Sequence, residues 1–276
     1  MKNTSGSVNF LYGTAVGRFI LKVIMNLHLD RIAVWFFHSP MSKVMNNWFI
    51  RKNGIQVTEE EKADFRSYRD LFARQKTDIP FDETPQHLIS PCDGWLSVFR
   101  INENSSFAIK NSHYRISDFL QDEELAKKYI DGDCLIFRLC VQDYHHYCYI
   151  DNGYQGKNHF IPGQLHSVQP IACETYPVFV LNRRSWCLME TENFGPVVQC
   201  EIGALVVGGI ENEKENAAFT KGTEKGHFEL AGSTIILLFE KGQIELKEEI
   251  LAQLSEAEEA RVKLGQWIGT SMNRNN

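Results

Sequence analysis

Residues 226–239 read GHFELAGSTIILLF, and this stretch holds the pattern that decides the fold. Positions 234–239 form an apolar run with β-branched side chains, and positions 227–230 form a shorter one, so each predicts a β-strand. Gly232-Ser233-Thr234 joins them. Glycine adopts backbone conformations that other residues resist, which would let the Ser233 hydroxyl approach the preceding carbonyl carbon. The triplet alone is a weak signal, because glycine followed by serine is common at turns and bulges.

Short apolar runs of the same kind recur on the N-terminal side of this stretch. The predicted strands cover residues 96–101, 134–141, 145–150, 165–168, 178–181, 186–191, 197–208, 227–230 and 234–239, separated by Gly, Asn, Asp or Pro turns. One helical insert is predicted near residues 117–129. The sequence contains no internal repeat, Walker loop or dinucleotide-binding glycine pattern. It therefore predicts an α+β fold with a mostly antiparallel β body.

The N-terminal part of the chain is typical of amphipathic helices. Apolar residues recur at helical spacing over residues 16–27, with Arg18 and Lys22 on the other side. Two more helices are predicted over residues 30–39 and 41–53, the second ending at a left-handed cap near Gly54. A charged helix near residues 59–75 follows. We predict a helical region with a linker over residues 1–78 and a β-rich catalytic domain over residues 79–276.

Charge is distributed unevenly along the chain. The net charge is −6, yet residues 1–55 hold seven basic residues and one acidic residue, which leaves 22 basic and 34 acidic residues for the rest. A basic, aromatic-rich end on an acidic body predicts contact with an anionic lipid surface. Nucleic acid is disfavoured as a partner, because Phe, Trp, Ile, Leu and Met dilute the basic residues. The alternative is that the apolar stripes pack on the body as ordinary core.

The sequence also bears on location and on redox chemistry. No apolar run approaches the roughly 18 to 20 residues that span a bilayer, and Arg18 and Lys22 interrupt the N-terminal apolar positions, unlike a cleaved signal peptide. We therefore expect a cytosolic protein. The seven cysteines, at positions 92, 134, 140, 148, 173, 187 and 200, are odd in number and include no Cys-x-x-Cys pair. Neither a disulfide framework nor a metal site is expected.

Candidate partners for a nucleophilic serine lie in two segments. Serine needs a base, and the base needs a group that orients it. Residues 90–94 read SPCDG and place Asp93 in a turn, while residues 142–149 read QDYHHYCY and place His145 and His146 on or beside a strand. Each has an ordinary reading, as a turn residue or as a hydrogen-bonded polar group. Their occurrence together gives them weight.

These segments resemble the phosphatidylserine decarboxylase family over almost the whole chain. The resemblance begins at FLYGT (10–14), runs through SPCDG and the Asp-Tyr-His strand, then FGPV (194–197) and VVG (206–208), and ends at Gly-Ser-Thr. It implies a proenzyme that cuts itself between Gly232 and Ser233 into a β chain (1–232) and an α chain (233–276) that stay associated. It also implies that Ser233 becomes a covalent pyruvoyl cofactor, that Asp93 belongs to the self-cleavage relay, and that His145 acts in decarboxylation.

The implied chemistry explains these residue types. The Ser233 hydroxyl attacks the preceding carbonyl, an ester replaces the peptide bond, elimination splits the ester, and the resulting dehydroalanine loses ammonia on hydrolysis. The carbonyl left behind serves as the electron sink that pyridoxal phosphate provides elsewhere. The resemblance further implies phosphatidylserine as substrate, an anionic membrane as partner, and a peripheral location on the cytoplasmic side of the cell membrane. It is also compatible with a homodimer.

One position departs from the family pattern. The second histidine of the family's Asp-Tyr-His-x-x-His strand falls on Cys148 here. Either Cys148 takes part directly, or a nearby histidine replaces the missing one, or the chain processes poorly. We favour His166 as the substitute, because a turn at residues 151–153 could fold its segment back against residues 145–150. His146 is less attractive, since it should face away from His145 on an alternating strand.

Three other functions compete with this interpretation. A related pyruvoyl decarboxylase could act on a soluble amino acid, since the same chemistry suits any amine beside a carboxylate. A catalytically silent lipid-binding relative would be consistent with Cys148. A hydrolase that uses Ser233 is the weakest alternative, because the sequence has no Gly-x-Ser-x-Gly elbow.

Overall fold

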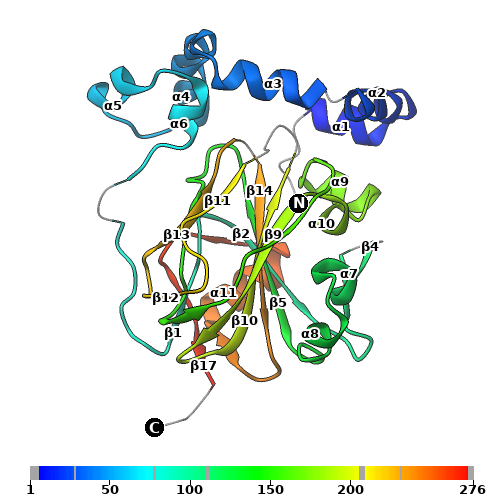
Figure 1. Cartoon of the computed structure of the whole chain (residues 1–276), viewed down its shortest axis with the longest axis vertical. Helices are drawn as coiled ribbons and strands as arrows, with labels where there is room; N and C mark the ends of the chain where they lie inside the picture. The colour runs from blue at the N-terminus through cyan, green and yellow to red at the C-terminus, as the bar shows by residue number, and fades with distance from the viewer. Residues whose placement is uncertain are drawn as a thin grey trace.

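The chain is described by a computed structural model that covers residues 6–27, 29–76, 79–109, 112–204, 209–230 and 232–272. The Val206-Val207-Gly208 motif, and with it the end of the strand predicted over residues 197–208, lies outside the described residues. Figure 1 shows a β-rich body with a layer of N-terminal helices across one end of it. The α+β class predicted from the sequence is confirmed.

Short helices make up the N-terminal region. They are α1 (Gly6–Gly13), α2 (Ala15–Asn26), α3 (Leu29–His38), the 3-10 helix η1 (Pro40–Met45), α4 (Asn46–Asn53), α5 (Glu59–Asp64) and α6 (Tyr68–Phe72). Thr14 caps α2 by accepting the Gly17 N–H at 2.9 Å. Gly54 ends α4 in the left-handed conformation, at φ +62°, as predicted. The division of the chain at residues 78 and 79 stays a prediction.

A nine-stranded antiparallel sheet forms the centre of the body. In spatial order its strands are β12 (Ala217–Phe219), β7 (Gly153–Gln155), β9 (Arg184–Thr191), β10 (Gly195–Gly203), β14 (Ser233–Phe239), β5 (Asp133–Leu139), β2 (Gly94–Arg100) and β16 (Ala260–Val262), with β8 (His159–Ile161) also on β9. Every residue of β14 is buried. Because alternate side chains of a strand point to opposite faces, Ile235 and Leu237 enter one hydrophobic core and Ile236 and Leu238 enter the other.

Smaller sheets and helices surround this sheet (Figure 1). One small sheet contains β1 (His87–Ile89), β17 (Trp267–Ser271) and β15 (Ile244–Leu246); a second contains β11 (Ile210–Asn212), β13 (Glu224–Phe228) and β6 (His146–Cys148); β3 (Ser106–Ile109) pairs with β4 (Ser112–Arg115). The remaining helices are α7 (Ile116–Leu120), α8 (Glu123–Lys127), α9 (Pro170–Thr175), α10 (Val178–Leu181) and α11 (Glu248–Ala257). The helical insert predicted near residues 117–129 is therefore confirmed as two short helices.

Two predicted strands are wrong. Residues 178–181 form the helix α10, and the buried Arg184 side chain stabilises its end by donating to the Val180 carbonyl at 2.6 Å. Residues 165–168 form no strand; Gln164 makes a single bridge to Asn182. Both runs are apolar because they pack against other elements, and a short buried run does not by itself distinguish strand from helix.

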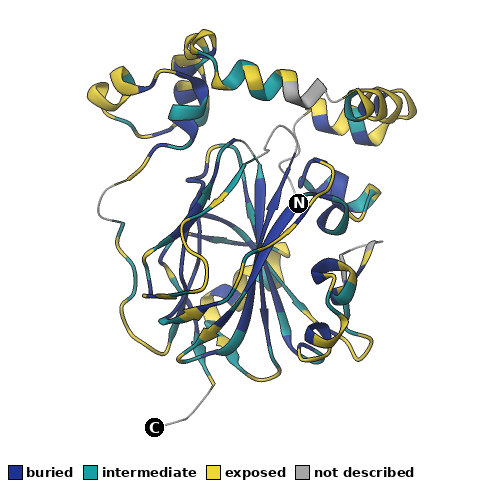
Figure 2. Ribbon diagram, in the orientation of Figure 1, coloured by how far each residue is buried: buried dark blue, intermediate teal, exposed yellow. Residues whose placement is uncertain are grey.

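Burial differs sharply between the two parts (Figure 2). The sheet is dark blue through its centre, whereas much of the surface of α1–α4 is exposed. No single helix among the described residues is long and apolar enough to cross a membrane, although the bent pair α1 and α2 passes that test together, at 95° to each other. The helical layer therefore leaves large apolar side chains uncovered at one end of the molecule.

Candidate active site

Ser233 is the first residue of β14 and lies in the interior. Its neighbour Gly232 has φ +76°, a left-handed conformation that favours glycine. The Ser233 side chain is fully buried, and its hydroxyl has no hydrogen-bond partner among the described residues. A buried hydroxyl left unpaired costs about 1–3 kcal/mol, so such an atom calls for an explanation.

The strand register places Asp93 at the same edge of the sheet. Ser233 pairs with Gly203 on one side and with Leu139 on the other, and Trp95↔Arg138 pairing puts Gly94 opposite Leu139. We call these four aligned residues the processing edge. Ser233 and Gly94 are two strand spacings apart, about 10 Å, and the buried Asp93 directly precedes Gly94. The structure therefore brings two of the predicted site residues to one edge.

The Asp93 carboxylate faces the segment that follows β16. One oxygen accepts the Leu264 N–H at 3.0 Å, and the other lies 3.8 Å from Lys263 Nζ. Both contacts orient the carboxylate, and an oriented Asp93 suits the relay role that the sequence predicts for it.

Cys148 lies against the turn that holds Asp93. Its N–H donates to the Pro91 carbonyl at 2.9 Å, and its thiol lies 3.9 Å from the Ser90 carbonyl oxygen. Burial raises the pKa of the Cys148 thiol to about 12. The thiol is therefore protonated at neutral pH and is not equipped to take a proton from serine.

His145 has one ring nitrogen fixed and the other free. Its Nδ1 lies 2.9 Å from the Asp143 carbonyl oxygen, which can only accept, so Nδ1 carries the proton. Its Nε2 is buried and has no hydrogen-bond partner within the described ranges of the chain. Phe72 of α6 packs on the ring at 4.2 Å between centroids, and burial lowers the His145 pKa to about 4. This ring is thus a neutral imidazole with an unused lone pair.

The conformation of Asp143 is set by Arg261. The two side chains form an ion pair, in which Arg261 Nη1 lies 3.2 Å from Asp143 Oδ2. The same carboxylate also accepts the Cys140 N–H at 2.7 Å and so closes the turn after β5. This buried ion pair holds the Asp143 carbonyl that orients His145.

His166 is buried but is not hydrogen-bonded to Ser233. Its Nε2 lies 2.8 Å from Gln164 Oε1, its Nδ1 lies 3.3 Å from Tyr12 Oη of α1, and burial lowers its pKa to about 4. Asn182 connects its segment to the processing edge, donating to the His166 carbonyl at 2.7 Å and to the Gly203 carbonyl at 2.8 Å. The backbone carbonyl of His166 is therefore linked through Asn182 to Gly203, the residue opposite Ser233.

The chain route predicted for His166 is wrong. The turn at residues 151–153 does not fold residues 165–168 against residues 145–150, because β6 pairs with β13, while β7 pairs with β9 and β12. The segment of His166 lies beside Asn182 instead. Pairings between strands far apart in sequence are not encoded in the local pattern, which is why the route was missed.

Sequence reasoning also missed the segment after α6 and the cavity beside it. The Ala73 carbonyl faces His146 Nε2 at 3.2 Å, and the Lys76 N–H donates to Tyr144 Oη at 3.0 Å. A cavity of about 210 Å³ opens here, lined by Lys76, Tyr144, His146, Cys148, Glu224 and Leu264 among others. The alternation of residues 144–148 could have indicated that Tyr144, His146 and Cys148 share one face.

The sequence of this chain is similar to those of known proteins. A sequence profile described as phosphatidylserine decarboxylase matches residues 68–270. A phosphatidylserine decarboxylase proenzyme 2 from Clostridium acetobutylicum is 40% identical, over 96% of this chain and 92% of the relative. Proenzymes of the same name from Clostridium botulinum are 36% identical over 79% of this chain and 75% of the relative (strain Eklund 17B), and 34% identical over 95% and 92% (strain 657). The chain therefore belongs to the phosphatidylserine decarboxylase family.

Proposed function

We propose that this protein decarboxylates phosphatidylserine to phosphatidylethanolamine, using a pyruvoyl group that it makes from Ser233 by cutting itself between Gly232 and Ser233. One observation carries the proposal: a buried serine hydroxyl without a partner follows a left-handed glycine, at the sheet edge that also holds Asp93. The relatives are named phosphatidylserine decarboxylase proenzymes, and this name supports phosphatidylserine as the substrate.

Self-cleavage uses residues of the chain alone. The Ser233 oxygen attacks the Gly232 carbonyl carbon, and the bond from that carbon to the Ser233 nitrogen breaks, which leaves an ester. Elimination then breaks the bond between Oγ and Cβ of residue 233, so that Gly232 becomes a new C-terminus. Hydrolysis of the dehydroalanine at position 233 releases ammonia. His166 takes the hydroxyl proton, which then passes to the departing Ser233 nitrogen, while Asp93, on the other side of Ser233, is the carboxylate of the relay.

The site fits a covalent group at position 233. The group supplies an electrophilic carbonyl that accepts the electron pair released with carbon dioxide. The surrounding residues exclude water, since Ser233, His145 and Phe228 are all completely buried. His145 Nε2 has no hydrogen-bond partner among the described residues, which leaves its lone pair available to the substrate.

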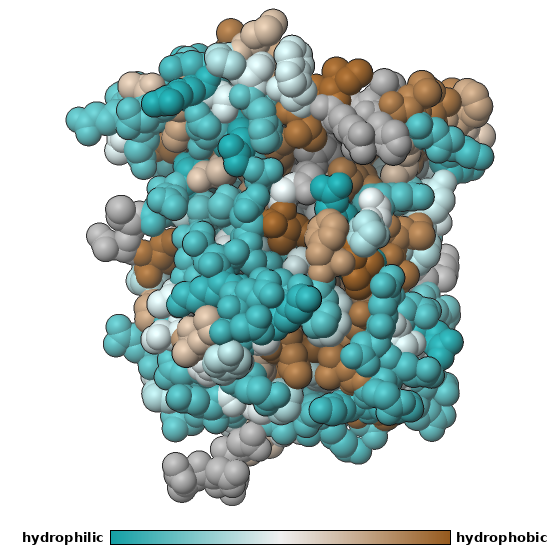
Figure 3. All heavy atoms as spheres, viewed as in Figure 1, coloured by the Kyte–Doolittle hydropathy of each residue, from teal (hydrophilic) through white to brown (hydrophobic). Residues whose placement is uncertain are grey.

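We further propose that the helical layer binds an anionic membrane from the cytoplasmic side. Large apolar side chains are exposed on α1–α4 and η1: Phe10, Val16, Phe19, Ile20, Val23, Leu27, Ile32, Trp35, Met41, Val44 and Trp48. Figure 3 shows hydrophobic atoms gathered over this end of the molecule. Basic side chains accompany them, and Lys52 Nζ lies 4.6 Å from the Trp48 ring centre. Apolar anchors with basic neighbours suit a headgroup boundary.

The helical layer also lies close to the site. Tyr12 of α1 contacts His166, and Phe72 of α6 packs on His145. A lipid held by these helices would therefore present its headgroup near the processing edge, an arrangement that favours a lipid substrate over a soluble amino acid. The homodimer stays a prediction.

Mass spectrometry and a carbonyl label test the proposal. Purified protein should split into fragments 1–232 and 233–276, the second fragment should react with a hydrazide, and Ser233→Ala should abolish both results. Ser255→Ala, on the exposed side of α11 in the same fragment, is the matched control and should behave as wild type. An intact, unlabelled wild-type chain would refute self-processing and favour a silent lipid-binding relative.

Substrate choice needs a second measurement. Carbon dioxide release should require phosphatidylserine in vesicles, and free serine or aromatic amino acids should give none. Equal or faster release from a free amino acid would overturn the lipid assignment while leaving the self-processing result in place.

A further inference from the structure

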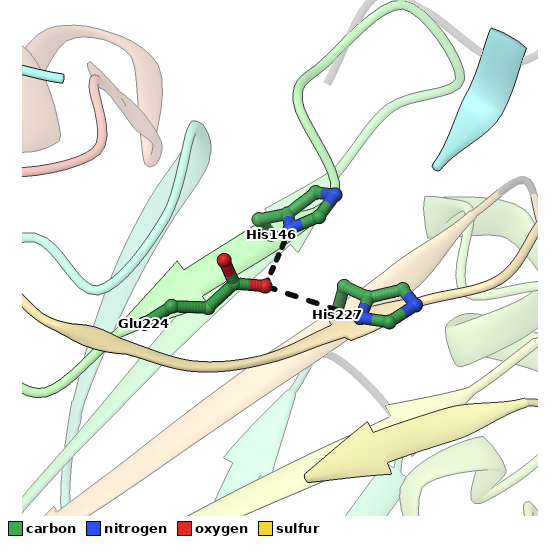
Figure 4. A group of neighbouring side chains, drawn as sticks. All are labelled: His146, Glu224 and His227. Atoms are coloured by element: carbon green, nitrogen blue, oxygen red, sulfur yellow. Dashed lines mark hydrogen bonds and ion pairs between the residues drawn. The ribbon is translucent and has the colours of Figure 1, made fainter. Parts of the chain in front are cut away.

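Two histidines and a glutamate meet at the mouth of the cavity beside β6. They are His146 of β6 and Glu224 and His227 of β13 (Figure 4). One candidate ligand atom from each lies within 4.8 Å of the other two. Glu224 Oε1 lies 2.6 Å from His146 Nδ1 and 3.9 Å from His227 Nδ1. Figure 4 shows the carboxylate reaching toward both rings.

The backbone is shaped to bring these side chains together. His146 and His227 are direct cross-strand partners, with ring centres 4.9 Å apart. On a regular strand, Glu224 and His227 would face opposite sides, because they are three residues apart. The register shifts between Glu224 and Gly226, and this irregularity returns Glu224 to the face of His227. Lys225 points to the other side, into a buried ion pair with Glu201 at 2.8 Å.

The hydrogen bonds around the two rings suit metal ligation. A metal-bound histidine ordinarily donates its second ring N–H to a carbonyl or carboxylate. The Ala73 carbonyl occupies that position for His146, 3.2 Å from Nε2, which leaves Nδ1 to face the carboxylate. His227 Nδ1 is buried with no hydrogen-bond partner in the part of the chain that the structure describes, and 3.9 Å to the carboxylate is too long for a hydrogen bond. The three residues therefore include one potential metal-ligand atom, His227 Nδ1, that makes no hydrogen bond to any described residue.

The surroundings leave room for an ion to enter. The cavity of about 210 Å³ is lined by His146 and Glu224, while the Glu224 and His227 side chains are partly exposed. Lys76 also lines the cavity, but its ammonium lies over the Tyr144 ring, 4.7 Å from the centre.

We propose that His146, Glu224 and His227 bind one divalent transition-metal ion of the zinc type, with a fourth position open to the cavity. Two imidazoles and a carboxylate with one open position form a known zinc ligand set. Tetrahedral zinc holds its ligand atoms about 3.3 Å apart, given bonds of roughly 2.0–2.2 Å. The distances of 2.6 and 3.9 Å lie on either side of that value, so side-chain rotations close the site. A bound ion would cross-link two paired strands through their side chains: β6, which carries Cys148, and β13, which precedes Gly232.

Calorimetry on the untagged full chain tests the site, after treatment with a chelator and in buffer without phosphate. Zinc chloride should bind with a stoichiometry of one ion per chain and should raise the melting temperature. His227→Asn and Glu224→Gln should each weaken binding by about tenfold or more. Cobalt chloride should give the visible absorption of a four-coordinate site in the wild type and should lose it in both variants.

His87→Asn is the matched control. His87 also forms a histidine–carboxylate pair, with Asp82 at 3.0 Å, but it belongs to no three-ligand group among the described residues. Its substitution should leave zinc affinity unchanged. Should His227→Asn unfold, Glu224→Gln decides the question, because its side chain is 35% exposed. Wild-type binding by Glu224→Gln, or no saturable binding of zinc by the wild type, would overturn the proposal. Neither result depends on decarboxylase activity.

Discussion

The Ser233 hydroxyl and His145 Nε2 are both buried, and neither has a hydrogen-bond partner among the residues that the structure describes. Each unpaired atom costs about 1–3 kcal/mol in the folded state. A protein that needed these residues only for packing could use alanine and phenylalanine at lower cost. The two atoms are therefore where we expect the chemistry to occur.

His166→Ala should slow self-cleavage by at least about a hundredfold, in the range that a lost general base costs. The reason is that His166 is the base we propose for Ser233: its ring is neutral at pH 7, and its backbone is held near Gly203, opposite Ser233, through Asn182. Time courses of fragment 233–276 on gels measure the rate. His159→Ala, which removes a histidine stacked on Trp186, should cleave normally.

Cys148→Ala is the companion variant and should cleave within a few-fold of the wild type, because the thiol is protonated at neutral pH. Normal cleavage by His166→Ala combined with a block in Cys148→Ala would reverse the two assignments.

The same histidine makes stability depend on pH. The folded-state pKa of His166 is lowered from 6.5 to about 4 by burial, so the unfolded chain binds a proton that the folded chain does not between these values. Its contribution to stability is complete above about pH 6.5 and is lost as the pH falls toward 4, by up to roughly 3 kcal/mol. Urea unfolding of Ser233→Ala, which stays one covalent chain, should show this loss.

His166→Gln in the same background should reduce that pH dependence over the same range, and the remainder should come from His145, whose pKa burial also lowers to about 4. An unchanged slope would mean that His166 is not the group that takes up the proton on unfolding.

At the scale of elements, α2 is rich in apolar residues, yet several of its large apolar side chains are exposed. Phe19 is 69% exposed in the folded chain, although burying such a side chain in an apolar environment is worth about 1.5–3 kcal/mol. The neighbouring helices α3, η1 and α4 also carry exposed apolar side chains, such as Trp35, Val44 and Trp48. The protein therefore retains apolar surface that water does not favour, next to basic side chains.

Phe19→Ser should weaken binding to phosphatidylserine vesicles by about tenfold or more, while leaving the melting temperature in detergent-free buffer nearly unchanged. Vesicle flotation measures the binding. Phe160→Ser is the control, because Phe160 is 58% exposed but belongs to β8 of the central sheet and not to the helical layer. Equal losses for both variants would argue for general stickiness in place of a defined membrane face.

Local elements were predictable where local physics decides them. The helix over residues 16–27 follows from the spacing of its apolar residues, and the helix that ends at Gly54 follows from its glycine cap. The long apolar run after Ser233 forms β14. The helix α10 was missed because its buried side chains pack against residues far away in the sequence, such as Tyr114, whose ring centre lies 5.2 Å from that of Phe179. The metal-binding trio was missed because it needs the β6–β13 pairing and a register shift within β13.

At the scale of the whole molecule, the proposed cut divides the sheet without removing a strand from it. Fragment 233–276 supplies β14, which pairs with β10 on one side and β5 on the other, and it also supplies β15, β16, β17 and α11. Both hydrophobic cores take side chains from β14. The two fragments are therefore held together by the centre of the fold.

Processed protein should elute from gel filtration as one species, even at high salt, and should separate only in denaturant. Ile236→Ala should lower the free energy of unfolding by about 2–5 kcal/mol, whereas Leu251→Ala, on the exposed side of α11, should change it by about 0.5 kcal/mol or less. Urea unfolding monitored by circular dichroism tests both. Dissociation of the fragments in native buffer would contradict this account.

The position of Ser233 between Gly203 and Leu139 has a further consequence for how the protein matures. A serine at the start of the central strand meets its reaction partners only after both neighbouring strands have been laid down beside it. Under the proposed chemistry, a misfolded or truncated chain keeps its peptide bond and stays inert. The fraction of chains cut in a cell extract would then record how many molecules passed this built-in quality control, and a harmful folding mutation would be visible as uncut precursor before any activity is assayed.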